Sequence, residues 1–207
     1  MPPKIDIAAL HRAAESGNLD AQLCLGSAYF QGLDVPRDDA QAAAWYRKAA
    51  EQGSAEAQYN LGLIYENGAG LPQDNRQAAS WHRKAAEQGY RGSQECLGEM
   101  YADGRGVSLD ETQAVAWYRK AAEQGSAHAQ FQLGARYEVG RSVVPQDLVY
   151  AHFYYSLAAS RATRITKALN ERARDRVTAK MTQQQIAEAQ KLAREWVAAF
   201  EQRQKKQ

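Results

Sequence analysis

A twelve-residue string, AWYRKAAEQGSA, occurs twice in the chain, at 44–55 and at 116–127. Identical strings of this length, 72 positions apart, are far beyond chance, so they are copies of one structural unit. The 72-residue spacing is two periods of a shorter repeat, because glycine, tyrosine and tryptophan residues recur every 36 positions. The series are Gly17, Gly53, Gly89 and Gly125; Gly26, Gly62, Gly98 and Gly134; Tyr29, Tyr65, Tyr101 and Tyr137; Gly32, Gly68, Gly104 and Gly140; and Trp45, Trp81 and Trp117. A one-residue insertion in GRSVVPQD precedes Tyr154, so the sequence contains four units.

The first half of each unit is predicted to be an amphipathic helix. In SAEAQYNLGLIYENG, Ser54 is placed to cap the helix and Gly68 to end it in a left-handed turn. Apolar residues at i, i+4, i+7 and i+8 from Ala57 give it one apolar face. Gly62 inside this helix costs about 1 kcal/mol relative to alanine, which predicts close approach of a partner helix.

The second half of each unit has its own helix-start signal. Asp38–Gln41, Asp74–Gln77 and Asp110–Gln113 have the spacing of a capping box. The fourth unit keeps Asp147 but has Tyr150 in place of the glutamine, so we expect a weaker cap there. Two helices per unit therefore repeat four times.

Such a unit buries its apolar face only by stacking on a neighbour, and the ends of the stack need caps. The sequence therefore predicts an all-α, right-handed α-solenoid of about four 36-residue helix-turn-helix repeats. The expected boundaries are a capping helix at 5–17, repeats at 18–53, 54–89, 90–125 and 126–160, and C-terminal capping helices with a basic tail at 161–207. Thr182 with Gln185 forms a further capping box in the C-terminal segment.

Charge is uneven along the chain. Residues 160–207 hold twelve of the 26 Lys and Arg residues but only five of the 24 acids. A basic tail can contact nucleic acid or an anionic surface, although acids and bases alternate here as on a solvated helix. The N-terminal stretch lacks the apolar core of a signal peptide, which predicts a cytoplasmic protein. A mature exported protein whose signal has been removed has the same appearance.

The segment AQYNLGLIYENGAGLPQDNRQAASWHRKAAEQG carries the pattern A…LG..Y..G.G…D…A..W..KAA..G. This pattern resembles the Sel-one-like repeat (SLR) family, a bacterial relative of the tetratricopeptide repeat, over roughly residues 8–160. The resemblance implies a curved helical scaffold that binds proteins or peptides. Some members resemble immunity proteins of bacterial secretion systems. A cysteine-rich branch of the family has been linked to penicillin binding and β-lactamase activity, but this chain has only Cys24 and Cys96, two units apart, and we expect both to be reduced.

No pattern in the sequence indicates catalysis. The histidines His11, His82, His128 and His152 are scattered and lack metal-ligand spacing. His82 stands where Tyr46 and Tyr118 stand in other units, so a structural role is favoured. We therefore predict a non-enzymatic protein without metal or cofactor, and no small-molecule substrate.

Functional variation is expected on the first helix of each unit, by analogy with the concave face of tetratricopeptide folds. The second helices scarcely vary, whereas the first helices differ at their outward positions. The predicted partner-binding residues are Asp20, Leu23, Ser27 and Phe30 in unit one; Glu56, Tyr59, Leu63, Glu66 and Asn67 in unit two; Glu95, Glu99, Ala102 and Asp103 in unit three; and His128, Phe131, Ala135 and Glu138 in unit four.

Acids concentrate in units two and three of this face, with Phe, Leu and Tyr at its flanks. The leading hypothesis is a scaffold whose acidic groove takes an extended or helical protein segment with Lys or Arg and apolar anchors. One alternative is an immunity protein that neutralises a secreted toxin by direct binding. The other is contact with nucleic acid or an anionic membrane surface through the basic tail, which we consider less favoured. The sequence leaves the oligomeric state open.

Overall fold

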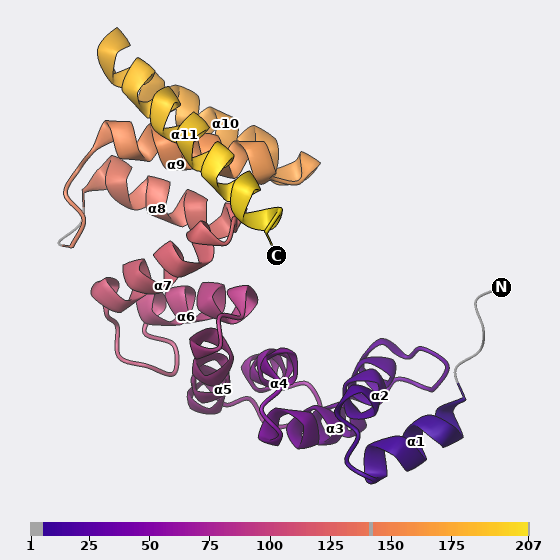
Figure 1. Ribbon diagram of the computed structural model, residues 1–207. Helices are drawn as coiled ribbons and strands as arrows, with labels where there is room; N and C mark the ends of the chain where they lie inside the picture. The colour runs from indigo at the N-terminus through magenta and orange to yellow at the C-terminus, as the bar shows by residue number, and fades with distance from the viewer. Residues whose placement is uncertain (1–5, 141–142, 207) are drawn as a thin grey trace. The chain divides into compact units, whose positions relative to one another are not determined.

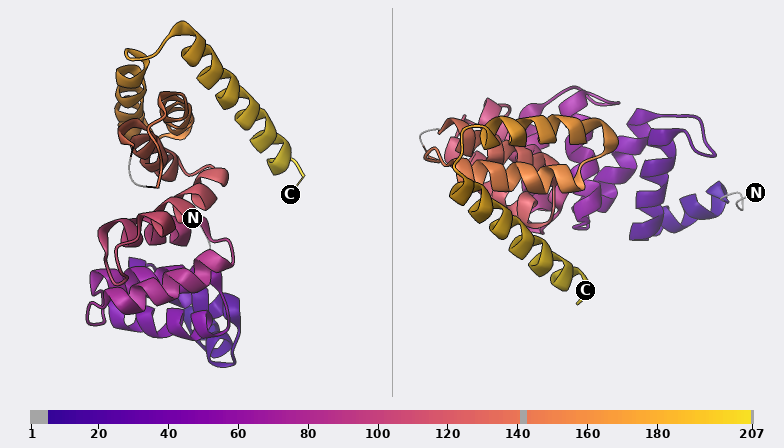
Figure 2. Two further views of the ribbon diagram at one scale, coloured as in Figure 1. Left: turned by 90° about the vertical axis from the view of Figure 1, so that its left-hand side faces the viewer. Right: turned by 90° about the horizontal axis from the view of Figure 1, so that it is seen from above.

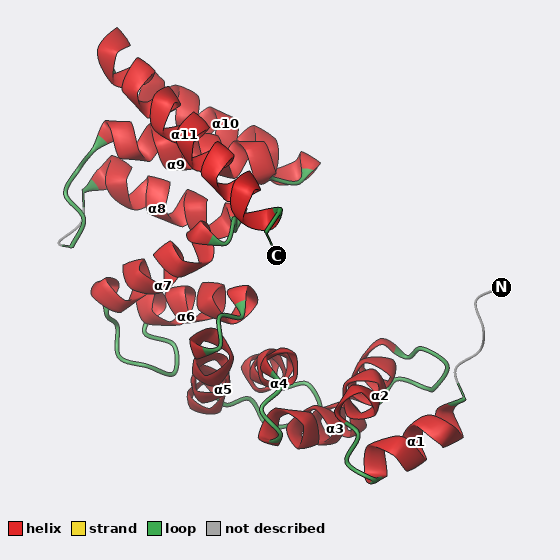
Figure 3. Cartoon of the chain, viewed as in Figure 1, coloured by secondary structure: helices red, strands yellow, loops and turns green. Residues whose placement is uncertain are grey.

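The computed structural model of the chain describes residues 6–140 and 143–206. Its described residues form eleven helices and no strand, as Figure 3 shows. The helices are α1 Ile7–Glu15, α2 Leu19–Gln31, α3 Asp39–Glu51, α4 Ala55–Asn67, α5 Asn75–Glu87, α6 Arg91–Asp103, α7 Glu111–Glu123, α8 Ala127–Val139, α9 Leu148–Arg161, α10 Arg164–Thr178 and α11 Gln183–Gln204. The predicted all-α solenoid of four two-helix repeats is confirmed.

The chain divides into two compact units, Met1–Leu109 and Asp110–Gln207. In the first unit, α1 to α6 pack in chain order, each helix against the next (Figure 1). In the second, α7 packs on α8 and α8 on α9, while α10 and α11 both pack on α9. Figure 2 shows α11 as one long uninterrupted helix. Ile5, where the N-terminal cap was predicted to start, and Arg141 and Ser142 of the inserted loop lie outside the described residues.

The predicted helix caps form with aspartate and serine. Asp38 accepts hydrogen bonds from the backbone N–H groups of Ala40 and Gln41, both at 3.0 Å. Asp147 caps α9 in the same way, so the tyrosine at the glutamine position does not prevent the cap. The full reciprocal capping box occurs at Thr182 and Gln185. At Asp38, Asp74 and Asp110 the structure shows the aspartate half of the predicted capping box and not the glutamine half.

Glycine inside the first helix of a repeat allows a large ring of the second helix to lie against its backbone. A Cβ atom on Gly26 would lie 2.7 Å from the ring of Tyr46, and one on Gly62 would lie 2.6 Å from the ring of His82. Both distances are too short for real side chains. The predicted close helix approach is thus made by the residue after each tryptophan position.

A buried glutamine joins each repeat to the helix before it. Gln22 Nε2 donates to the carbonyl of Ala14 at 3.0 Å, and Gln58 Nε2 donates to the carbonyl of Ala50 at 3.1 Å. Gln94 and Gln130 repeat this bond at the same position. Each of these carbonyls also accepts from the N–H of the glycine three residues later, so the amide adds a second hydrogen bond at the helix end.

Candidate functional site

The predicted partner-binding residues divide into exposed and half-buried groups on the first helices. In the first compact unit the exposed ones are Asp20, Phe30, Glu56, Asn67 and Asp103, and the half-buried ones are Leu23, Ser27, Tyr59, Leu63, Glu66, Glu95, Glu99 and Ala102. In the second compact unit His128 is exposed, and Phe131, Ala135 and Glu138 are half-buried.

An aromatic pair joins α4 to the start of α6. The rings of Tyr59 and Tyr90 lie 5.0 Å apart at an angle of 35°. Burial raises the pKa of Tyr59 to about 12, and Cys96, Tyr90, Glu95 and Glu66 contribute further. The pKa of Tyr90 is also raised, first by burial and then by Glu56. Two half-buried phenols thus lie beside carboxylates, and both stay protonated at neutral pH.

The local sequence of α6 departs from the repeat to accommodate this pair. Tyr90 occupies the N-cap position that Ser54 and Ser126 fill in other repeats, and α6 has no side-chain cap bond. Gly92 in the first turn leaves room for the rings, because a Cβ there would lie 2.9 Å from Tyr59 and 3.3 Å from Tyr90. A lost cap costs about 1 kcal/mol and a helical glycine about as much. Local rules are broken most often at functional sites.

Four of the six acids predicted for the binding face in the first unit are paired within the chain. Arg105, which follows α6, contacts Glu66 with Nη1, lies 3.6 Å from Glu99 through Nη2 and lies 3.5 Å from Asp103 through Nε. Arg91 lies 3.5 Å from Glu95. The predicted acidic face is therefore partly neutralised by two arginines that the sequence reasoning did not place there.

In the second unit, α10 contacts the predicted partner-binding residues of α8. Arg176 donates to both carboxylate oxygens of Glu138, at 2.8 and 2.6 Å, and Lys180 lies 3.8 Å away. Ala173 and Val177 of the same helix are buried in a cluster that Phe131 and Ala135 join. A cavity of about 280 Å³ lies nearby, lined by His128, Phe131, residues 161–163 and part of α10.

Three ligand-type side chains converge beneath the tyrosine pair. Glu66 of α4, His82 of α5 and Cys96 of α6 each place one ligand atom within 4.8 Å of the other two. His82 is fully buried and its ring lies 5.8 Å from that of Tyr59. His82 and then Arg105 favour the ionised form of Glu66 and lower its pKa to about 2, although burial opposes them. Burial raises the pKa of Cys96 to about 12.

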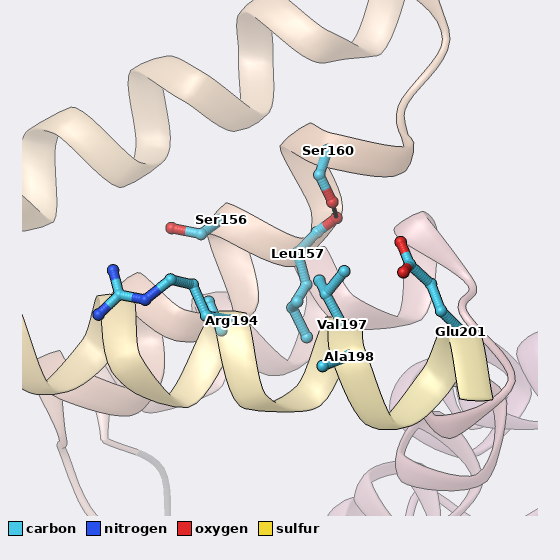
Figure 4. Close-up of a pocket in the computed structure, with 8 residues that line it drawn as sticks. Ser156, Leu157, Ser160, Arg194, Val197, Ala198 and Glu201 are labelled. Atoms are coloured by element: carbon cyan, nitrogen blue, oxygen red, sulfur yellow. Dashed lines mark hydrogen bonds between the residues drawn. The ribbon is translucent and has the colours of Figure 1, made fainter. Parts of the chain in front are cut away.

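An apolar groove separates α9 from α11. Figure 4 shows Leu157 of α9 facing Val197 and Ala198 of α11, with Arg194 and Glu201 toward its two ends. Its volume is about 330 Å³. The hydroxyl of Ser160 donates a hydrogen bond of 2.8 Å to the carbonyl of Leu157. The groove presents no convergent set of acid, base and nucleophile, and none of the predicted partner-binding residues lines it.

Sequence reasoning missed Tyr90, Arg105 and the convergence on His82. Tyr90 could have been found, because tyrosine is out of place at a position that is otherwise Asn or Ser. His82 is the only non-tyrosine among the four equivalent positions, which is a second signal. Arg105 lies in a loop with no repeat pattern of its own, so only the structure places it.

The fold and the stacked repeats define a helical-repeat protein of the α-solenoid class. The chain matches the Sel1 repeat at residues 19–54, 55–90, 96–126 and 127–162. These matches cover more than half of its length, so the protein belongs to the Sel1 repeat family. Repeats of this family generally mediate protein–protein interactions. Among the described residues, no helix is both long and apolar enough to cross a bilayer.

Solved bacterial structures share this fold. A protective antigen present in uropathogenic Escherichia coli strains, displaying an SLR fold, is 45% identical with a TM-score of 0.73, over 77% of this chain and 34% of that one. A Sel1 repeat protein from Oxalobacter formigenes is 37% identical with a TM-score of 0.69, over 74% and 62%. The chain thus spans less than two thirds of either relative.

An immunity protein from Pseudomonas aeruginosa is 23% identical with a TM-score of 0.51, over 95% of this chain and 72% of that one. At this identity the likeness concerns the fold alone. No curated protein matches the chain.

Proposed function

We propose that this protein is a non-catalytic scaffold that binds a protein segment at a surface centred on Tyr59 and Tyr90. The observation that carries the proposal is the replacement of a helix cap by an aromatic ring. The chain gives up the serine cap of α6 and places glycine in its first turn, and both changes accommodate the tilted pair of tyrosine rings. Packing of the two rings offsets only part of this loss, since an aromatic pair contributes about 0.5–1.5 kcal/mol, whereas tyrosine is enriched among residues that dominate binding energy.

The charge around the pair favours a basic segment. Glu56 is exposed near Tyr90, and Glu95 is half-buried near Tyr59. Carboxylates at the rim of an aromatic surface speed encounter with Lys or Arg and disfavour acidic partners. The tyrosines supply most of the affinity, and the acids select a partner of positive charge.

The second unit offers an intramolecular precedent for this kind of segment. On α8, the half-buried Phe131 and Glu138 are covered by a helix that presents Arg176 together with the buried Ala173 and Val177. We propose that an external partner uses the same chemistry on the first unit, a basic residue beside apolar anchors. Asp20, Leu23, Ser27, Phe30, Leu63 and Asn67 extend the proposed surface along α2 and α4.

The test is selection of peptides from a displayed random library against the full chain, followed by titration of the selected peptides. We expect a consensus that combines Lys or Arg with Phe, Leu or Met. Tyr90→Ser should weaken binding by about 30-fold or more, since truncating a dominant contact residue costs 2 kcal/mol or more. The same variant restores the serine cap, so its stability should equal or exceed that of the parent.

Tyr150→Ser serves as the control, because Tyr150 is an exposed tyrosine on α9, outside the proposed surface. Its binding should be unchanged. Selection without a basic and apolar consensus, or full binding by Tyr90→Ser, would refute the proposed surface. The two alternatives predict different results. An immunity protein would bind a secreted toxin equally well with and without Tyr90→Ser. If the basic tail binds an anionic polymer, the affinity should fall steeply with salt and on removal of residues 183–207.

A further inference from the structure

The ligand atoms of Glu66, His82 and Cys96 have a spacing suited to a metal ion. His82 Nε2 lies 3.6 Å from Glu66 Oε2, beyond hydrogen-bond distance. In a tetrahedral zinc site, a nitrogen and an oxygen ligand lie roughly 3.4 Å apart, given zinc–ligand bonds of about 2.1 Å. All three ligand atoms lie within 4.8 Å of one another, so a modest adjustment of the side chains would bring them around one ion.

The imidazole of His82 is the independent sign that a ligand is missing. The side chain is fully buried, and Nε2 makes no hydrogen bond within 3.5 Å but faces Glu66 Oε2 at an ion-pair distance of 3.6 Å. A buried polar atom without a partner costs about 1–3 kcal/mol, and such an atom in a native structure calls for a ligand, an ion or water. The other ring nitrogen, Nδ1, lies 3.3 Å from the hydroxyl of Ser93. That contact fixes the ring and leaves Nε2 directed at Glu66, as outer partners do for metal-bound histidines.

Repeat four has the same framework without these ligands. There Tyr155 takes the position of His82 and donates to Glu138, which takes the position of Glu66. Arg176 binds Glu138 much as Arg105 binds Glu66. The tyrosine hydroxyl completes that arrangement with a hydrogen bond of 2.9 Å. In repeat two, replacing tyrosine by histidine leaves the carboxylate oxygen without that bond and offers a nitrogen lone pair instead.

We infer that Glu66, His82 and Cys96 form a binding site for one zinc ion. Thiolate, imidazole and carboxylate are all ligands that zinc accepts, and a mixed sulfur and nitrogen set selects it over magnesium or calcium. Three protein ligands leave a fourth position for water. The three residues come from α4, α5 and α6, so the ion links three successive helices beneath Tyr59.

The surrounding charge supports a divalent cation despite Arg105. Its guanidinium engages Glu66 through Oε1, while Oε2 of the same carboxylate faces His82. It also pairs with Glu99 and Asp103, so its charge is shared among three carboxylates. Glu95 acts on Cys96 as well. Acids therefore outnumber bases around the three ligands.

The direct test is titration of the reduced full chain with zinc alone, followed by competition with a chromophoric chelator. We expect one tightly bound ion per chain. Cobalt in place of zinc should give the strong visible bands of tetrahedral coordination together with a thiolate-to-cobalt charge-transfer band. Cys96→Ser should abolish the charge-transfer band and weaken binding by more than about 100-fold, because even outer partners of metal ligands contribute 10–100-fold.

His82→Tyr is the decisive variant, because tyrosine occupies this position in the other three repeats and the fold tolerates it. It should retain the helical circular dichroism of the parent and lose zinc. Cys24→Ser removes the exposed cysteine at the equivalent position of repeat one and should bind zinc like the parent. Absence of zinc binding by the reduced parent, or undiminished binding by His82→Tyr or Cys96→Ser, would overturn the inference. Peptide binding at Tyr90 is measured separately, so the two proposals fail independently.

Discussion

The hydroxyl of Tyr155 donates a hydrogen bond of 2.9 Å to Oε2 of Glu138. The same carboxylate accepts two hydrogen bonds from Arg176, so three donors from α9 and α10 converge on one acid of α8. The Glu138 side chain is only 10% exposed, whereas that of Arg176 is 56% exposed. This glutamate therefore links α10 to the last repeat, together with the apolar cluster that buries Ala173 and Val177.

This arrangement predicts a pH-dependent contribution to stability. The pKa of Glu138 is lowered, first by Arg176 and then by Tyr155 and Lys180. A carboxyl with a lower pKa in the folded state stabilises the fold above its unfolded pKa of about 4.3. That stability is lost as the pH falls through the folded pKa. Glu138→Gln should lower the free energy of unfolding by about 1 kcal/mol at pH 7, since Arg176 is exposed to solvent.

Urea denaturation of the parent and Glu138→Gln from pH 7 to pH 3 measures this effect. The difference in unfolding free energy should shrink as the pH falls below the unfolded pKa of the glutamate, because the protonated side chain resembles glutamine. Glu188→Gln, at an exposed position of α11, controls for the loss of one surface charge. A difference that stays constant across the range would mean that the ion pair is not its source.

The buried glutamines give a second prediction. Gln58 donates to the carbonyl of Ala50 and accepts a bond of 2.8 Å from Gln88. Gln58→Leu keeps a similar volume but removes both of these hydrogen bonds, while the Ala50 carbonyl still accepts from the N–H of Gly53 and Gln88 still donates to the carbonyl of Lys84. We expect the free energy of unfolding to fall by about 1–3 kcal/mol. Gln77→Ala, at an exposed position of α5, should change it by less than about 0.5 kcal/mol in the same urea titration. Equal effects of the two substitutions would contradict a structural role for Gln58.

The repeat period predicted the helices, their caps and the stacking. It succeeded because a 36-residue step in glycines and aromatics reports positions that every unit must share. The glutamines at 22, 58, 94 and 130 keep the same step, yet their burial was not predicted. Glutamine is most often exposed, so a polar residue in register gives no sign of whether it faces solvent or a carbonyl of the next helix.

The candidate sites were harder to predict from the sequence, for a related reason. Exposed positions such as Glu56 could be placed on a helix face from their spacing alone. The partners of the acids could not, because Arg105 and Arg176 reach Glu66 and Glu138 from 39 and 38 residues away. Tyr90 and His82, which depart from the repeat, were the strongest signals. The structural interpretation of His82 did not consider that Glu66 and Cys96 would lie beside it.

The close approach of α2 and α3 gives a third prediction. Alanine is about 1 kcal/mol better than glycine in a helix interior, so propensity alone predicts that Gly26→Ala stabilises. Its Cβ would lie 2.7 Å from the buried Tyr46 ring, and overpacking of this kind costs about 1–3 kcal/mol. We expect net destabilisation in thermal unfolding. Combining Gly26→Ala with Tyr46→Leu should relieve the clash, so the cycle should show a coupling of about 1 kcal/mol or more. Strict additivity would indicate that the ring is not the obstacle.

The docking of α11 gives the last prediction. Ala189 of α11 is completely buried, α11 packs mainly on α9, and Ala187 on the same helix is exposed. Aspartate has the same helix propensity at both positions, so the difference between Ala189→Asp and Ala187→Asp isolates burial. A charge at the buried position either detaches the helix or destabilises the unit, and we expect a cost of at least about 3 kcal/mol. Detachment would expose Leu157 and the apolar groove of Figure 4, which should increase binding of a hydrophobic dye. Ala187→Asp should match the parent in both thermal unfolding and dye binding. If the two variants behave alike, α11 is not held to α9 through this face.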